Sequence, residues 1–190
     1  KIAATYYYHQ LKSEAGKSGL DYLVKRGLSD KTINSFGLGF APQSTGELYR
    51  MLKDKGYDDG ILKESGLFTY EKGVRDKFWN RVIFPIMDIN NKVIGFGGRV
   101  MGDAKPKYLN SPETKLFDKS RNLYGLNAAR TARKNNLIIC EGYMDVIAMH
   151  QYGFSSAVAS LGTSLTEQQA QSIKKYCNNS KLFITEAFVD

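Results

Sequence analysis

The stretch that decides the fold reads Leu137-Ile-Ile-Cys-Glu-Gly-Tyr-Met-Asp-Val-Ile-Ala-Met-His-Gln151. Its first four residues are wholly apolar, which is typical of a short strand that is covered on both faces of a sheet. The residues from Tyr143 to Gln151 then predict a helix that ends before Gly153, because a glycine suits the left-handed turn after a helix. A buried strand followed directly by a helix is the first half of a parallel crossover unit.

The residues that follow repeat this alternation. Residues 157–159 predict a second buried strand, and Thr166 with Gln169 forms a candidate capping box for a helix that runs to Tyr176. Residues 181–185 predict a third strand. Strand and helix alternating in this order imply right-handed crossovers between parallel strands. We therefore expect an α/β fold for residues 121–190, with helices flanking a parallel sheet.

The sequence before this part has a different pattern. Short apolar stripes that end at glycines predict several helices, and the apolar runs 82–87 and 93–100 predict a β-hairpin. Pro85 favours an edge or bulge position for the first of these strands. Residues 102–120 are polar and are expected to be mostly loop. We therefore expect residues 1–120 to form a mixed α+β subdomain that carries a basic loop.

Composition limits the classes of function. The chain has 190 residues, of which 42% are hydrophobic and 12% aromatic, and this is typical of a globular protein. Lys plus Arg exceed Asp plus Glu by 27 − 19 = 8, which favours an anionic partner. Two cysteines and two histidines are too few for a disulfide framework or a Cys/His zinc site, and a reducing compartment fits them best. No apolar run approaches the ~20 residues that a membrane span requires.

The positive charge is concentrated in residues 99–134. These 36 residues contain nine basic and three acidic side chains, and so account for +6 of the net charge of +8. The aromatic residues Tyr108, Phe117 and Tyr124 are interleaved with them. Cations that contact phosphates, next to rings that stack on bases, are what a single strand of nucleic acid requires. A solvated, lysine-rich surface explains the same charge, so charge alone leaves both interpretations open.

Glu141 stands directly after the predicted strand of residues 137–140, at the edge where open parallel sheets bind ligands. Asp145 lies one turn into the following helix. Two carboxylates in these positions can bind a hard divalent cation. They also favour the positive N-terminus of the helix without any metal, and position alone does not decide between the two interpretations.

Six stretches of the sequence are recognisable together. They are Lys25-Arg-Gly-Leu-Ser29, Phe78-Trp-Asn-Arg-Val-Ile-Phe-Pro-Ile86, Val93-Ile-Gly-Phe-Gly-Gly-Arg-Val100, Pro106-Lys-Tyr-Leu-Asn-Ser-Pro-Glu-Thr114, Glu141-Gly-Tyr-Met-Asp-Val146 and Ala157-Val-Ala-Ser-Leu-Gly-Thr163. In this order they resemble the RNA-polymerase core of bacterial DNA primases of the DnaG type, and the stretch from Glu141 resembles the first acidic motif of its Toprim domain. The resemblance extends to about Lys181.

This resemblance implies metal-dependent nucleotidyl transfer, in which a single-stranded DNA template is copied into a short RNA primer from NTPs. It implies catalytic roles for Glu141, Asp145, Lys107 and Lys119, with Glu141 organising Mg²⁺ or Mn²⁺. Divalent ions suit this chemistry because they offset the charge on the triphosphate. The resemblance also implies nucleic-acid binding by Arg26, Arg99, Lys107, Tyr108, Lys119 and Arg121.

The chain departs from the family pattern near its end. A Toprim domain of this type carries an Asp-x-Asp pair where the strand of residues 181–185 finishes, whereas this chain reads Thr185-Glu-Ala-Phe-Val-Asp190. We expect a truncation or a missing internal stretch, and hence weak metal binding and low activity for this chain by itself. We also expect this chain to lack the zinc-binding and helicase-binding modules that the family carries.

The expected partners are single-stranded DNA, NTPs and primer RNA, with a replicative helicase reached through the absent C-terminal module. We expect a monomer that works in the bacterial cytoplasm and makes no membrane contact. Two alternatives stay open. One is another Toprim enzyme, such as a nuclease or topoisomerase relative, which would cleave DNA. The other is a non-catalytic module that binds single-stranded DNA.

Overall fold

The computed structural model describes residues 1–44, 46–71, 73–134, 136–162, 164–176 and 183–185. The chain divides into two compact units. The first comprises Lys1–Pro85 and Gly95–Leu116, and the second comprises Ile86–Ile94 and Phe117–Asp190. The tip of the predicted hairpin therefore belongs to the second unit, although both of its strands begin or end in the first.

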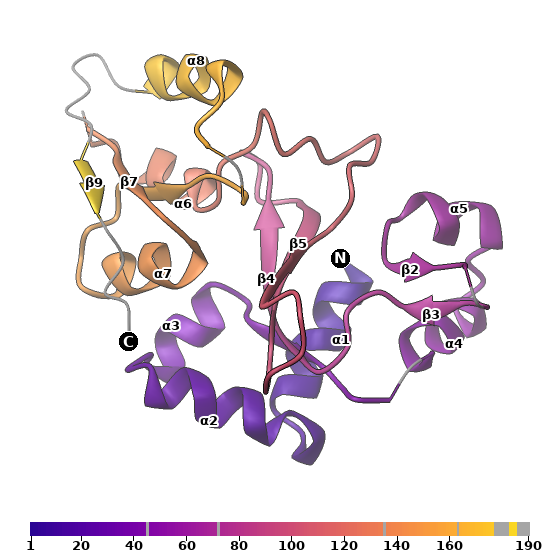
Figure 1. The fold of residues 1–190 in the computed structure, drawn as a ribbon. Coiled ribbons are helices and arrows are strands. Elements are labelled where there is room, and N and C mark those ends of the chain that lie inside the picture. Colours follow the sequence, from indigo (N-terminus) through magenta and orange to yellow (C-terminus); the bar gives the residue numbers. More distant parts are fainter. Residues whose placement is uncertain (45, 72, 135, 163, 177–182, 186–190) are drawn as a thin grey trace. The chain divides into compact units, whose positions relative to one another are not determined.

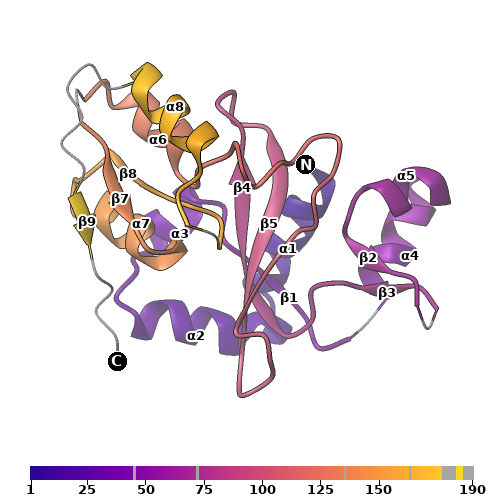
Figure 2. The same cartoon turned by 45° about the horizontal axis from the view of Figure 1, so that its top comes forward.

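The first unit combines short helices with two antiparallel sheets. Its helices are α1 (Ile2–Leu11), the 3-10 helix η1 (Glu14–Gly16), α2 (Lys17–Lys25), α3 (Asp30–Ser35), α4 (Glu47–Asp54) and α5 (Asp59–Glu64). Its strands are β1 (Gly39–Ala41), β2 (Phe68–Thr69), β3 (Arg75–Asp76), β4 (Arg81–Met87), β5 (Val93–Val100) and β6 (Tyr108–Asn110). Figure 2 shows β2 and β3 beside α4. Asp76 of β3 joins these elements, since its carboxylate accepts the N–H groups of Gly46 and Leu48 over 3.0 and 3.4 Å.

The larger sheet has the strand order β1-β4-β5-β6, and Figure 1 shows β4 and β5 side by side. The predicted hairpin is thereby confirmed. Strand β4 lies in the interior of the sheet, however, and not at an edge, which was one of the two positions that Pro85 favoured. Pro85 is tolerated because β1 pairs with β4 only from Arg81 to Ile83, so among the described residues the proline lies beyond the end of that pairing. Strand β6 is a short paired segment within residues 102–120, which were expected to be mostly loop.

Aromatic rings from three parts of the chain fill the core of the first unit. Tyr7 of α1 packs edge-on against Phe96 of β5 with ring centroids 5.4 Å apart, and Phe78 lies 6.2 Å from Phe96. Gly98 of β5 allows this packing, because a Cβ atom there would lie only 2.8 Å from the Phe78 ring and 3.1 Å from the Arg81 side chain. The glycine thus permits a close approach between β5 and the residues that precede and begin β4.

The second unit contains the parallel sheet that the sequence predicts. Its helices are α6 (Leu126–Thr131), α7 (Tyr143–Gln151) and α8 (Glu167–Tyr176), and its strands are β7 (Ile138–Cys140), β8 (Ala157–Ala159) and β9 (Phe183–Thr185). The strand order is β8-β7-β9, and both pairings are parallel, with Cys140 opposite Ala159 and Thr185. Figure 1 shows the three helices around this small sheet. The α/β prediction is confirmed, and helix α7 has the predicted bounds.

A compact apolar cluster supports this sheet. It combines residues in or just before β7, β8, α6 and α8, namely Leu123, Leu126, Ala129, Leu137, Ile139, Val158 and Ile173. Each of these side chains is at most 9% exposed, so the helices cover the strands as a buried parallel sheet requires. Among the residues that the structure describes, no helix is both long enough and apolar enough to cross a bilayer.

Candidate nucleic-acid and catalytic site

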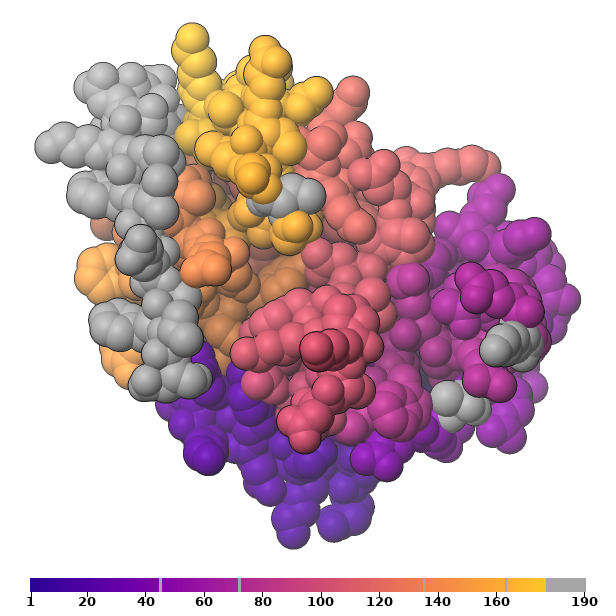
Figure 3. Space-filling model, in the orientation of Figure 1, coloured from indigo at the N-terminus to yellow at the C-terminus, as the bar shows by residue number. Residues whose placement is uncertain are grey.

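The segment from Arg99 to Tyr108, called the 99–108 segment below, leaves β5 and returns as β6. Arg99 pairs with Tyr108 across the two strands, and the N–H of Val100 donates to the carbonyl of Lys107 over 3.0 Å. Residues 102–108 are all exposed. Figure 3 shows this part of the chain, in pink-red, at the surface of the first unit. Three predicted nucleic-acid-binding residues are thus neighbours on one exposed turn.

Helix α2 adds a fourth such residue. The guanidinium carbon of Arg99 lies 4.1 Å from the centre of the Tyr22 ring, which is a cation–π contact. Arg26 follows Tyr22 by one turn, since its N–H donates to the Tyr22 carbonyl over 3.0 Å. The Tyr22 contact therefore brings the end of α2 to the 99–108 segment. Sequence reasoning missed Tyr22, because no pattern in α2 distinguishes this tyrosine from a core residue.

Arg81 fixes the backbone of the 99–108 segment from beneath. Its side chain is 6% exposed, and Nη1 donates to the carbonyls of Gly98, Pro106 and Lys107 over 3.2, 2.9 and 3.3 Å. Burial lowers the pKa of the Arg81 guanidinium, and hydrogen bonds to carbonyl oxygens compensate such burial. Sequence reasoning missed this role as well. The signal for it in the sequence was an arginine placed directly before the apolar run of residues 82–87.

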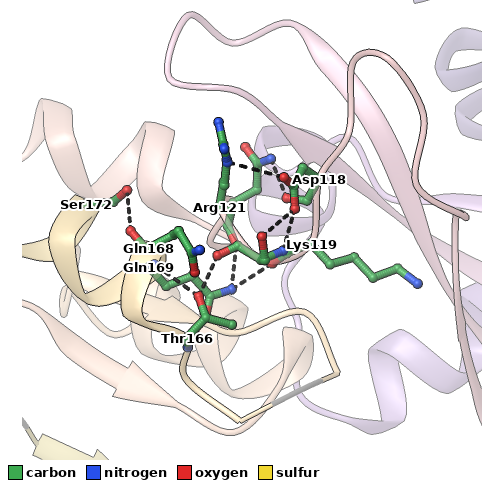
Figure 4. Close-up of polar contacts among 9 residues, drawn as sticks. Asp118, Lys119, Arg121, Thr166, Gln168, Gln169 and Ser172 are labelled. Carbon is green, nitrogen blue, oxygen red and sulfur yellow. Dashed lines mark hydrogen bonds and ion pairs between the residues drawn. The ribbon is translucent and has the colours of Figure 1, made fainter.

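Lys119 and Arg121 belong to a tight turn in the second unit, residues 118–122, called the 118–122 turn below. The Asp118 carboxylate accepts the Ser120 hydroxyl and N–H over 2.6 and 2.8 Å, and lies 3.3 Å from Nε of Arg121. The bond from the Ser120 hydroxyl is the main cause that lowers the pKa of Asp118. Figure 4 shows the Lys119 side chain extending away from these contacts.

Tyr124 connects this turn to strand β8 and to helix α7, which begins just after Glu141. Its backbone exchanges hydrogen bonds of 2.8 and 3.1 Å with Ala159 at the end of β8. Its ring packs edge-on against Tyr143, the first residue of α7, with centroids 4.7 Å apart. Because Tyr143 follows Glu141 by two residues, the chain that leaves the 118–122 turn is fixed to the helix that begins after Glu141.

Glu141 is exposed at the carboxyl end of β7, where the sequence predicts it. Asp145 has a structural role, since its Oδ2 accepts the N–H of Gly142 over 3.1 Å at the start of α7. Among the described residues, no three His, Cys, Asp or Glu side chains gather as a metal-binding group. Glu186 and Asp190, the acidic residues that follow the strand where an Asp-x-Asp pair was expected, lie outside the described residues. The described residues therefore do not by themselves make up a magnesium site.

The candidate residues are thus distributed over both units. Arg26, Arg99, Lys107 and Tyr108 gather in the first unit. Lys119 and Arg121 share a turn in the second unit, which also contains Glu141 and Asp145.

Comparisons with known proteins decide the family. A family model described as the N-terminal domain of the DNA primase catalytic core matches residues 6–130. The chain belongs to the DnaG-type family of DNA primases. A Toprim-like model matches residues 138–189, so the DnaG resemblance of the six sequence motifs is confirmed along the chain.

Individual DnaG relatives agree with this assignment. A DNA primase of Clostridium acetobutylicum is 50% identical over 178 residues, which are 93% of this chain and 30% of the relative. The chain thus spans less than a third of that curated relative. The structure of a DnaG primase catalytic domain bound to single-stranded DNA matches with a TM-score of 0.87 at 43% identity, over 95% of this chain and 57% of the other. The RNA polymerase domain of Mycobacterium tuberculosis DnaG matches with a TM-score of 0.91 at 31% identity, over 96% and 63%.

Proposed function

We propose that this chain is part of the polymerase core of a primase, which makes short RNA primers from NTPs on single-stranded DNA at the replication fork, in the cytoplasm. One observation carries the proposal beyond the family match. Within the second unit, the chain that bears Lys119 and Arg121 is fixed through Tyr124 to the start of α7, next to the exposed Glu141. An acidic strand end and a cationic turn in one packed unit suit the transfer of a charged nucleotide.

Each residue then has a proposed task. Glu141 binds Mg²⁺ or Mn²⁺ together with carboxylates that the described residues do not supply, and the bound ion would offset the charge of the triphosphate. Asp145 contributes through its bond to Gly142, which fixes the backbone directly after Glu141. Lys107 and Lys119 neutralise phosphates, and Arg121 supports Lys119 from the same turn.

The first unit is proposed to guide the template. Arg26 and Arg99 contact its phosphates, while the ring of Tyr108, which is 41% exposed, stacks on a base. The DnaG structure determined with single-stranded DNA supports this ligand. A monomeric state and a replicative helicase as partner belong to the same proposal and rest on the family alone.

The test is primer synthesis by the full-length protein with a single-stranded template, NTPs and Mg²⁺. We expect Glu141→Gln to lower the rate at least about 100-fold, because it removes a carboxylate charge that serves the metal. The affinity for the template should change less than about twofold, since the substitution leaves the cationic segments intact. Glu14→Gln, at an exposed carboxylate of the first unit, is the matched control and should leave synthesis unchanged.

Other products would identify the alternatives. Cleavage of the template without labelled RNA would favour a nuclease. Binding of the template by the full-length protein, with neither RNA synthesis nor cleavage, would favour a binding module. A large loss of template affinity in Glu141→Gln would contradict the role assigned to Glu141.

A further inference from the structure

Helix α8 contacts the 118–122 turn through a buried glutamine. The Gln169 side chain has an exposed fraction of 0%. Its Nε2 donates to the carbonyl of Lys119 over 2.8 Å and to the carbonyl of Asn122 over 2.9 Å. Both hydrogens of the amide are therefore used, and they fix the backbone on both sides of Arg121.

The other polar atoms of the same cluster are used as well. Gln169 Oε1 accepts the N–H of Thr166 over 3.1 Å, and the N–H of Gln169 donates to Thr166 Oγ1 over 3.1 Å. This is the reciprocal capping box that the sequence predicts. The Thr166 hydroxyl in turn donates to the carbonyl of Ser120. Figure 4 shows how the two side chains meet the backbone of the turn.

These contacts exceed what a helix cap requires. A capping box satisfies N–H groups at the start of its own helix. Here Thr166 and Gln169 also donate to three carbonyls of a segment 46 to 50 residues earlier in the chain. These carbonyls belong to Lys119, Ser120 and Asn122, so they include the carbonyl of Lys119 itself and lie on both sides of Arg121. The direction of both cations thus depends on Gln169 of α8 and on Thr166, the residue directly before this helix.

We propose that Gln169 and Thr166 are positioning residues, which fix the direction in which Lys119 and Arg121 present their charges to a phosphate group. This inference rests on the proposed function, and deepens it by naming what orients these cations. The phosphate belongs either to the template strand or to the incoming nucleotide. Template affinity and the KM for NTP distinguish these two sources.

The central variant is Gln169→Met in the full-length protein, because methionine has a similar length and no hydrogen-bonding amide. We expect it to weaken template binding, or to raise the KM for NTP, by about threefold to tenfold through the misdirected cations. The same substitution in a Lys119→Ala/Arg121→Ala background should change the same quantity less than about twofold, because residues that act through one another are not additive. Fluorescence anisotropy with a labelled single strand measures template affinity, and initial rates at varied NTP concentration give the KM.

Three control variants separate positioning from loss of a cap. Thr166→Ser keeps the hydroxyl and should behave as the unmodified protein, whereas Thr166→Val should show the same defect as Gln169→Met. Asp58→Ala removes another helix cap, in which Asp58 Oδ1 accepts the N–H of Ile61 over 2.8 Å at the start of α5. This variant should leave template affinity and KM unchanged. If Gln169→Met does not fold, the comparison of Thr166→Val with Thr166→Ser decides whether these hydrogen bonds position the cations.

Three results would overturn the inference. If Lys119→Ala weakens binding or raises KM while Gln169→Met and Thr166→Val do not, the positioning role is wrong and the proposed function is unaffected. If Gln169→Met has the same effect with and without Lys119 and Arg121, its role is only structural. If Lys119→Ala and Arg121→Ala have no effect themselves, both the inference and the role of these cations in the proposed function are wrong.

Discussion

The 99–108 segment and the 118–122 turn both have backbone carbonyls that accept hydrogen bonds from a buried side chain, but the donor side chains differ. In the first unit, the 99–108 segment rests on Arg81, whose guanidinium donates to three carbonyls. In the second unit, the 118–122 turn rests on Gln169, whose neutral amide donates to two. Each donor is buried, and each comes from a distant part of the sequence.

The difference lies in the charge that accompanies each segment. Arg81 adds a positive charge beneath residues that are already basic, which strengthens attraction for a phosphate backbone. Each segment also contains one aspartate, and in the 118–122 turn Asp118 lies 3.3 Å from Nε of Arg121 and offsets part of its charge. From this comparison we propose that the first segment would attract a nucleic acid mainly by charge, whereas the second would present its cations in a defined geometry.

The largest effect is expected from removing the charged donor. Arg81→Met should lower the free energy of unfolding by about 2–4 kcal/mol, because three carbonyls lose a buried donor while the hydrocarbon volume is kept. Arg81→Lys should lower it less, since an ammonium keeps the charge but does not reproduce the planar fork. Urea unfolding measures both variants. A loss below about 0.5 kcal/mol for Arg81→Met would show that water replaces the guanidinium.

The charge of the 99–108 segment is tested more narrowly by Lys107→Ala. We expect weaker binding of single-stranded DNA, and a slope of log K against log salt that is smaller by about 0.7 to 1, because one phosphate contact is lost. Lys63→Ala, at an exposed lysine of α5, is the matched control and should leave the slope as it is. An unchanged slope in Lys107→Ala would mean that Lys107 does not contact phosphate.

The smallest effect is expected from protonating Asp118, the carboxylate of the 118–122 turn. The Ser120 hydroxyl and N–H and the charge of Arg121 lower the pKa of Asp118. Its folded pKa therefore lies below its unfolded value of about 3.9. The stabilisation is complete above the unfolded value and is lost as pH falls through the folded one.

The chemical shift of the Ser120 amide, followed by NMR as the pH is lowered, measures this titration. It should report a midpoint below about 3.9, and Asp118→Asn should abolish the titration. The amide N–H of Lys107, whose carbonyl accepts from Arg81 Nη1, serves as the internal comparison. A midpoint at or above 3.9 would contradict the contacts assigned to Asp118.

Local patterns in the sequence predicted much of the second unit. The bounds of α7, the strand at residues 157–159 and the Thr166–Gln169 capping box all agree with the structure. These features depend on residues within a few positions of one another, so periodicity and cap chemistry are sufficient. Strand β6 was not predicted, because three residues in a polar stretch become a strand only by pairing with β5.

The amino-acid order alone thus determined the alternation of strands and helices, the concentration of basic residues and the place of Glu141 at a strand end. Only the tertiary structure decided which side chains fix the cationic segments. Arg81 meets carbonyls 17 to 26 residues away, Gln169 meets carbonyls 47 to 50 residues away, and Tyr22 meets Arg99. No local pattern encodes such contacts, because a buried donor takes its partners from whichever backbone packing brings within hydrogen-bond distance.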